Sequence, residues 1–399
     1  MNMLAGATEK PRPVYLALEG GGVLGIGHIG VGRVLHMMAG HYPVDTIVGT
    51  SAGAAAGAVL AAGISDERAR ELTLNFPYGE VVRGGVLQRV PGIELAADGV
   101  EIVRRGGMYS GDNLQRAVHA ALAQEGIEVF RDFDARVAAR VTNAAHLVVA
   151  AHDSNPQHGL VLFPRDYAAV YGINEEKRQL VDFAVRASSS IPGFFQPAEL
   201  TDAAGRRWLL ADGGIDALLP HDEAVQLAHE NNCSARILNV ALGGVGTASA
   251  PLDPGDPLFG IKFLVQTVRS APGGRRDDLL RDPAILKDSI VVDTAGISST
   301  CFSLTREQQL LLYSSGILSA SEWVVKDLGA RMTAVERGKL GAVLAETQVQ
   351  LRELARSSVS SSCQLHYPAV MALVQRAHKL DTSLSAGATP PERQVSSVG

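Results

Sequence analysis

The pentapeptide GTSAG at 49–53 is the part of the sequence whose residue types and spacing point most directly to chemistry. An apolar run typical of a strand precedes it, and the small residues 52–62 that follow predict a helix. A serine on such a sharp turn projects its hydroxyl above a sheet edge, and flanking glycines, here Gly49 and Gly53, permit the strained backbone. The following helix N-terminus favours developing negative charge. We therefore interpret Ser51 as an acyl-transfer nucleophile, with a helix N-cap as the alternative role.

A glycine cluster follows the first apolar run, 14–18, and leads into another helical pattern. Backbone N–H groups of such a turn hold an anion, either a dinucleotide pyrophosphate or the oxyanion of a tetrahedral acyl intermediate. A dinucleotide site would need an acidic residue at the end of the second strand, where this chain has the serine turn. We therefore expect an oxyanion hole, with Gly21, Gly22 and Val23 nearest the oxyanion. The whole candidate loop comprises Gly20, Gly21, Gly22, Val23 and Gly25.

A third element, Asp212-Gly213-Gly214, places a carboxylate at the end of an apolar run; a simple Asp-Gly turn is the alternative. The chain has eleven histidines, but none sits in a glycine-bearing turn after an apolar strand, as the base of a triad would. The sequence therefore favours a Ser51–Asp212 dyad, in which Asp212 accepts the serine proton. It contains no HExxH and no paired Cys/His ligand set, so we expect no metal and no cofactor.

The elements that must position these residues alternate between strands and helices. We predict strands at 14–18, 45–48, 147–151, 160–163, 207–211, 237–241 and 290–292, and helices at 65–75, 111–124, 177–188, 221–230, 305–326 and 330–356 besides those named above. This pattern predicts an α/β fold, a three-layer sandwich with a mainly parallel central sheet and a C-terminal helical extension. We divide the chain into an N-terminal tail (1–13), a catalytic domain (14–325), a helical extension (326–380) and a disordered polar tail (381–399), and expect 271–283 to be mobile.

The three motifs, in this order, resemble those of the patatin-like phospholipase family. EGGGVLG at 19–25 is similar to its oxyanion loop, GTSAG to its nucleophile elbow, and DGG to its DGG or DGA motif, so that Gly213 and Gly214 join Gly49 and Gly53 as supporting motif positions. HIGVGRVL, SSSIPGFFQPAEL and FSLTREQQLLLYSSGILSA are similar as well, and the resemblance spans 14 to about 325. It implies a modified α/β-hydrolase-like sandwich and a Ser–Asp dyad that cleaves acyl esters of lipids without a metal.

Three departures from the family pattern stand out. Glu19 precedes the glycines where the family often has Asp or Ser, Leu24 replaces a basic residue, and the Asn common after the DGG motif is missing from 215–220. Loss of the basic residue removes a positive charge near the oxyanion or a lipid phosphate, which affects headgroup preference. The backbone donors remain.

The resulting functional prediction is a lipid acyl hydrolase: a phospholipase A-type enzyme, a lysophospholipase or an esterase. The same serine would also serve an acyltransferase or a thioesterase. Two other classes remain as alternatives, a catalytically silent or activator-dependent lipid-binding module and a nucleotide-binding protein that uses the 20–25 loop. Segment 76–109 mixes apolar residues with arginines. It is a lid over the site, a segment that rests on an anionic interface or, as we favour, an ordinary surface excursion.

Composition narrows the partners and the location. With 36 basic and 42 acidic residues, a net charge of −6 and no basic tract, the chain is unsuited to binding nucleic acid. We expect a cytoplasmic protein, because the chain has only three cysteines and lacks both a signal-peptide pattern and an apolar run long enough to span a bilayer. Peripheral membrane association and export without a cleaved signal stay open. The expected partner is a lipid or phospholipid at a membrane interface. The C-terminal helices are candidates for binding a protein activator or a second copy of the chain.

Overall fold

The computed structural model describes residues 11–83, 105–155, 157–244, 276–356 and 367–385. Within these ranges a central sheet has eight strands in the order β10-β9-β1-β2-β4-β8-β7, with β5 paired to β4. The strands are β1 (Val14–Leu18), β2 (Val44–Thr50), β4 (His146–Asp153), β5 (Gly159–Phe163), β7 (Ala198–Thr201), β8 (Arg207–Asp212), β9 (Arg236–Leu242) and β10 (Ser289–Val292). Pairing is parallel from β10 to β4 and antiparallel among β4, β5, β8 and β7.

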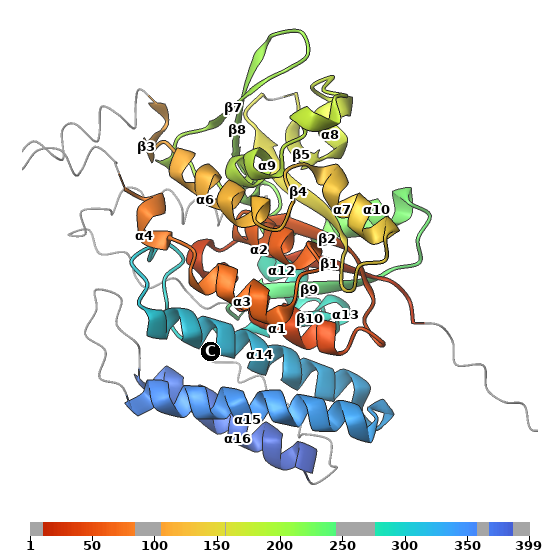
Figure 1. The fold of residues 1–399 in the computed structure, drawn as a ribbon, viewed down its shortest axis with the longest axis vertical. Coiled ribbons are helices and arrows are strands. Elements are labelled where there is room, and N and C mark those ends of the chain that lie inside the picture. The colour runs from red at the N-terminus through yellow and green to blue at the C-terminus, as the bar shows by residue number, and fades with distance from the viewer. Residues whose placement is uncertain (1–10, 84–104, 156, 245–275, 357–366, 386–399) are drawn as a thin grey trace, which may run out of the picture.

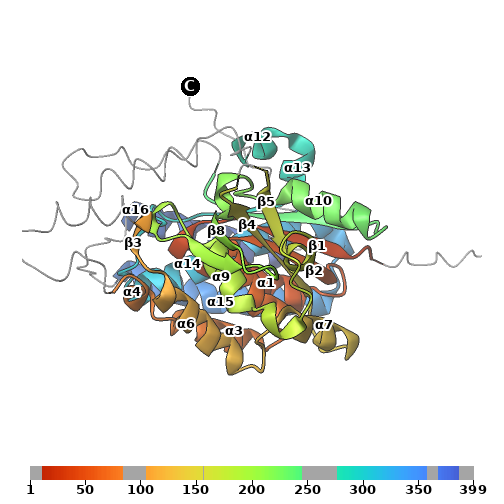
Figure 2. The same cartoon turned by 90° about the horizontal axis from the view of Figure 1, so that it is seen from above.

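Helices cover both faces of this sheet and give three layers (Figures 1 and 2). One face carries α1 (Ile26–Met37), α2 (Ala52–Ala61), α3 (Asp66–Leu74), α4 (Tyr78–Val81), α6 (Asp112–Ala123), α7 (Phe130–Ala138), α9 (Val181–Ser188) and α14 (Arg306–Leu328). The other carries α10 (His221–Glu230), α12 (Arg276–Arg281) and α13 (Pro283–Lys287). This arrangement confirms the predicted α/β sandwich.

The smaller elements complete the chain. They are α8 (Arg165–Ala169), a two-stranded ribbon of β3 (Gly107–Tyr109) and β6 (Gly193–Phe195), and the short 3-10 helices η1 (Gly22–Gly25), η3 (Glu176–Arg178), η4 (Gly213–Ile215) and η5 (Gly329–Arg331). The long helices α15 (Ala334–Arg356) and α16 (Tyr367–Ser385) pack beyond α14, away from the sheet (Figure 1). α16 continues past the domain boundary expected at 380.

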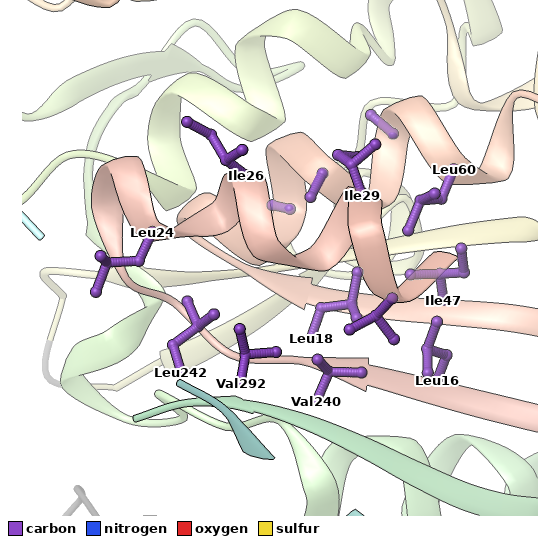
Figure 3. Packing of buried hydrophobic residues seen from close by; sticks show 14 of the residues in the cluster. Leu16, Leu18, Leu24, Ile26, Ile29, Ile47, Leu60, Val240, Leu242 and Val292 are labelled. Atoms are coloured by element: carbon purple, nitrogen blue, oxygen red, sulfur yellow. The ribbon is translucent and has the colours of Figure 1, made fainter. Parts of the chain in front are cut away.

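Strand alternation explains the two cores. Leu16 and Leu18 of β1 point to one face and pack with α1 and α2, whereas Tyr15 and Ala17 point to the other face and pack with α10. Figure 3 shows the first core, where strand residues from β1, β2, β9 and β10 meet Ile26, Ile29 and Leu60 of the helices. Because both faces are covered, all of β1 is buried, as its uninterrupted apolar sequence predicts.

Helices α1 and α14 cross at glycines. A Cβ atom at Gly316 would lie 2.0 Å from the carbonyl oxygen of Gly27, and one at Gly30 would lie 2.2 Å from that of Tyr313. The two backbones therefore touch where a side chain would hold them apart. This contact fixes α14 against the helix that begins just after the glycine loop.

Within the segment 271–283, residues 276–281 form α12 and residue 283 begins α13, and long-range contacts described below hold Arg276. Residues 271–275 lie outside the described residues, so the mobility expected of this segment stays a prediction. Cys301 is disulfide-bonded, and such bonds are rare in the reducing cytoplasm, the location favoured from the sequence.

Candidate active site

Ser51 lies on the sharp turn between β2 and α2, as the GTSAG motif predicts. Its backbone has φ 52° and ψ −117°, a strained conformation for a residue with a side chain. A Cβ atom at Gly53 would lie 2.1 Å from the carbonyl oxygen of Leu18, so the turn can pack this closely only on glycine. Ser51 is 4% exposed. The helix cap alternative loses support, because the Ser51 side chain makes no capping hydrogen bond.

Asp212 ends β8, and η4 follows it at once. Its Oδ1 accepts a hydrogen bond of 2.7 Å from the N–H of Gly214, and its own N–H donates to the carbonyl oxygen of Ser190 at 2.9 Å. The first bond fixes the carboxylate and the second fixes the backbone of Asp212 at the end of β8. The carboxylate is buried, with 6% of the residue exposed.

The glycine loop bends back over Ser51. A Cβ atom at Gly20 would lie 3.2 Å from that of Ser51. Several N–H groups of the loop already have carbonyl acceptors: Gly20 donates to Leu218, Leu24 to Gly21, and Val23, which was expected to face an oxyanion, to Ser299. The N–H groups of Gly21 and Gly22 have no acceptor among the described residues. These two are therefore the donors that the predicted loop leaves for an anion.

Ser51 and Asp212 line the same small cavity. Its other lining residues are Gly20, Gly21, Gly22, Ile191, Pro192, Gly214, Leu218 and Ser299. Ser51, Asp212 and the glycines at 20–22 thus line one space. Gly25, Gly49, Gly53 and Gly213 lie outside its lining and shape the turns around it.

A second, larger cavity begins at the same serine and is almost wholly apolar. It shares Gly22, Ser51 and Ile191 with the first cavity and has an empty volume of about 910 Å³ with its open mouth included. Its walls come mainly from small and apolar residues of α1, α2, α3 and α6, together with Phe76, Tyr78, Phe195 and Phe302. Burial raises the pKa of Tyr78 well above its ordinary value, so its phenol is neutral at physiological pH.

No histidine of the described chain lines either cavity. One His–Asp pair at this edge, His152 Nδ1 with Asp216 Oδ2 at 2.6 Å, lies on the other face of the sheet. His152 is two residues from Ala150 in β4 and therefore shares its face, the α10 side. His221 begins α10, as expected, and bonds to Asn239. The described residues also hold no cluster of three or more His, Cys, Asp or Glu side chains able to bind a metal ion.

Buried polar side chains support the glycine loop from behind. Glu19 is 3% exposed; one carboxylate oxygen accepts from the N–H of Leu242 at 2.6 Å and the other from Nε of Arg276 at 2.8 Å. Burial lowers the pKa of Arg276, but the neighbouring carboxylates of Glu19 and Asp277 raise it by more. The net effect is a raised pKa, so Arg276 stays charged. Nε2 of His28 donates to the carbonyl oxygen of Glu19 at 2.8 Å, and complete burial lowers the pKa of His28 to about 4. Leu24, the replaced basic position, is buried.

Sequence reasoning missed the residues that bind the site through tertiary contacts. Ser188 binds the backbone of Ser51, and Ser190 binds the backbone of Asp212. Ser299 binds the glycine loop, and Arg276 binds Glu19. The stretch that begins SSSIPG resembles the family sequence, but its residue types do not indicate which groups its side chains bind. Segment 76–109 contributes Phe76, Tyr78 and Val81 to the apolar cavity; residues 84–104 of that segment, and so the lid question, lie outside the described residues.

One comparison with known protein families agrees with the motifs. A family model described as patatin-like phospholipase matches residues 16–225, more than half of the chain. A search of curated protein sequences finds no match. Similar solved structures include VipD from Legionella pneumophila (13% identity, 96% of this chain and 89% of that chain, TM-score 0.40) and the type III effector protein ExoU (14%, 94% and 71%, 0.41). Another is the complex of SpcU with ExoU from Pseudomonas aeruginosa (14%, 94% and 79%, 0.33).

Proposed function

The chain belongs to the patatin-like phospholipase family, and we propose that it is a lipid acyl hydrolase in which Ser51 and Asp212 form a catalytic dyad. The observation that carries this proposal is the shared cavity. Ser51, Asp212 and the glycine loop line it together, and no histidine of the described chain does. Among the described side chains that line it, Asp212 is the one able to act as a general base.

The reaction proceeds in two acyl-transfer steps. Asp212 takes the proton of the Ser51 hydroxyl as its oxygen attacks the ester carbonyl, and the N–H groups of Gly21 and Gly22 hold the resulting oxyanion. The residue after a nucleophile on such a turn, here Ala52, supplies a further donor. Collapse expels the alcohol, which takes a proton from Asp212. Asp212 then deprotonates a water molecule, which attacks the acyl-enzyme carbonyl. As the fatty acid leaves, Asp212 returns the proton to the Ser51 oxygen and the enzyme is restored.

The two cavities divide the substrate between them. The apolar cavity accepts the acyl chain, because its walls offer almost only aliphatic and aromatic surface. The small cavity beside Asp212 receives the alcohol side of the ester. Since position 24 carries Leu rather than a basic residue, we expect weak dependence on a phosphate headgroup, so that lysophospholipids and neutral esters compete with diacyl phospholipids.

Acyl transfer to an acceptor other than water remains the alternative on the same serine, as does a catalytically silent lipid-binding module. A protein activator is a further proposal; the ExoU complex above includes a second protein, SpcU. For membrane contact we propose a peripheral mode. Within the described residues no helix combines the length and apolarity needed to cross a bilayer.

Labelling with a fluorophosphonate probe, followed by peptide mapping and ester hydrolysis, tests the proposal. Wild type should be labelled at Ser51 and should hydrolyse long-chain esters, whereas Ser51→Ala and Asp212→Asn should lose both activities with the fold intact. Asp216→Asn is the matched control, since it removes a carboxylate four residues along the same loop that pairs with His152 on the other face. Loss in Asp216→Asn equal to that in Asp212→Asn would overturn the dyad. A folded wild type that is not labelled, with or without anionic lipid vesicles, would support the silent module.

A further inference from the structure

The hydroxyl of Ser188, the last residue of α9, bridges the nucleophile turn and the neighbouring strand. It accepts a hydrogen bond of 2.7 Å from the N–H of Ser51 and donates one of 2.5 Å to the carbonyl oxygen of Ala150 in β4. Ser188 is fully buried and lines neither cavity. Its side chain therefore contacts the nucleophile's backbone without facing the substrate.

This bridge stands where the parallel ladder between β2 and β4 ends. Thr50 pairs with Ala150 as the last residue of the β2 register, and Ser51 then turns away from the sheet. The N–H of Ser51 and the carbonyl oxygen of Ala150, which would continue the ladder, therefore do not bond to each other directly. The Ser188 hydroxyl, which donates and accepts at once, fills this gap and satisfies both groups.

The bridge matters because the Ser51 backbone is strained. A conformation with φ 52° and ψ −117° persists only when surrounding contacts hold it. Without Ser188, a buried N–H and a buried carbonyl would both lose their partner, and the turn would relax toward a less strained conformation. Such a relaxation would move the serine hydroxyl relative to Asp212 and the glycine loop.

The same segment also holds the other member of the dyad. The carbonyl oxygen of Ser190 accepts from the N–H of Asp212, and the Ser190 hydroxyl is held by the backbone and guanidinium of Arg186. Arg186 is 4% exposed and further donates to the carbonyl oxygens of Ser110 and Gln196. Burial lowers its pKa to about 10, so it stays charged at physiological pH. The residues from Arg186 to Ser190 thus form one anchored unit that touches both Ser51 and Asp212.

We propose that Ser188 is a positioning residue for the Ser51 nucleophile: its hydroxyl fixes the strained turn in the geometry needed for attack. The inference rests on the proposed function, because it assigns Ser188 a role in the reaction of Ser51. It concerns the rate of acylation and not substrate binding, since Ser188 lies outside the lining of both cavities.

The experiment compares the labelling rate by a fluorophosphonate, and kcat and KM on a long-chain ester, in wild type, Ser188→Ala and Ser188→Cys. In Ser188→Ala the labelling rate and kcat should fall about 10- to 100-fold, as expected for a small misplacement of a reacting group, while KM stays unchanged. Ser188→Cys is nearly isosteric and retains a weak donor and acceptor. Its labelling rate and kcat should therefore lie between those of wild type and those of Ser188→Ala. It also supplies the readout if Ser188→Ala does not fold.

Ser321→Ala is the matched control. Ser321 is fully buried, its hydroxyl donates to the carbonyl oxygen of Ile317 at 2.7 Å, and it lies in α14 outside both cavities. This variant should lower the melting temperature without changing the labelling rate. Wild-type labelling rates in folded Ser188→Ala, or in Ser188→Cys if the alanine variant does not fold, would overturn the positioning role alone. Absence of labelling in wild type would overturn the proposed function, and this inference with it.

Discussion

The carboxylate of Glu19 and the guanidinium of Arg276 form a buried ion pair across 2.8 Å, although 257 residues separate them in the chain. Arg276 also donates to the backbone oxygens of Leu242 and Gly244, so the pair joins the start of the glycine loop to the end of β9. Glu19, at the position where the family often carries Asp or Ser, thus links the glycine loop to β9 and to Arg276.

Replacing Glu19 by Gln should therefore destabilise the protein, because it leaves the Arg276 charge buried with only the half-exposed Asp277 beside it. We expect a loss on the order of 3 kcal/mol in the free energy of unfolding, measured by urea denaturation. Asp278→Asn is the control, since Asp278 forms an exposed pair with Arg281 in the same helix, and it should cost less than about 0.5 kcal/mol. Equal effects in the two variants would contradict a structural role for the Glu19 pair.

Acid should weaken the fold through His28. Burial lowers its pKa from 6.5 to about 4 in the folded state. Between pH 6.5 and pH 4, His28 is therefore protonated in the unfolded chain but neutral in the folded chain. The stabilisation from the neutral side chain is complete above pH 6.5 and is lost as the pH falls toward 4, by on the order of 3 kcal/mol in total. Unfolding free energies measured between pH 7 and pH 4.5 should follow this course.

His28→Gln separates this effect from general acid denaturation. Glutamine keeps an N–H donor for the Glu19 carbonyl oxygen but does not titrate. The variant should therefore show a shallower loss of stability over the same pH range. Parallel curves for variant and wild type would exclude His28 as the source.

The apolar cavity predicts selectivity for acyl length. Ala121 of α6 lines the cavity, whereas its neighbour Ala120 is exposed. Ala121→Leu should lower kcat/KM for a sixteen-carbon ester relative to a four-carbon ester by about tenfold, because lost hydrophobic contacts in a pocket cost ~1–3 kcal/mol. Ala120→Leu should leave the ratio unchanged. A similar ratio in both variants would mean that the acyl chain binds elsewhere.

The crossing of α1 and α14 should not tolerate a methyl group. Gly316→Ala places a Cβ atom 2.0 Å from a backbone oxygen of α1 and should cost about 2–3 kcal/mol through overpacking. Gly338→Ala is the contrasting variant in α15, where nothing lies within 4 Å of the added atom, and it should stabilise by roughly 0.5–1 kcal/mol. Thermal melts of the two variants should shift in opposite directions.

The parts of the site that were predictable from sequence are those whose function depends on local backbone shape. Ser51 and Asp212 each follow an apolar strand and precede glycines, so their turns can be read from a few neighbouring residues. The central strands were equally readable, because strands buried on both faces leave uninterrupted apolar runs. Whether the two residues act as a dyad stays a prediction.

Contacts that form only in the folded chain were not predictable. Ser188 reads as one polar residue in a run of three serines, and only the junction of β2, β4 and α9 reveals its partners. Arg276 lies in a charged, glycine-rich stretch whose composition favours mobility, and its helix forms where Glu19 binds it. The antiparallel pairing of β4 with β8, which puts Asp212 beside Ala151, likewise has no local signal.

The position of β1 also sets an order of assembly during synthesis. β1 carries the glycine loop and lies between β2, which directly precedes Ser51, and β9, which ends at Leu242. A nascent chain thus contains Ser51 long before β9 can pair with β1 and Arg276 can pair with Glu19. The glycine loop therefore gains these two supporting contacts only after the chain beyond the matched family region, 16–225, has been synthesised.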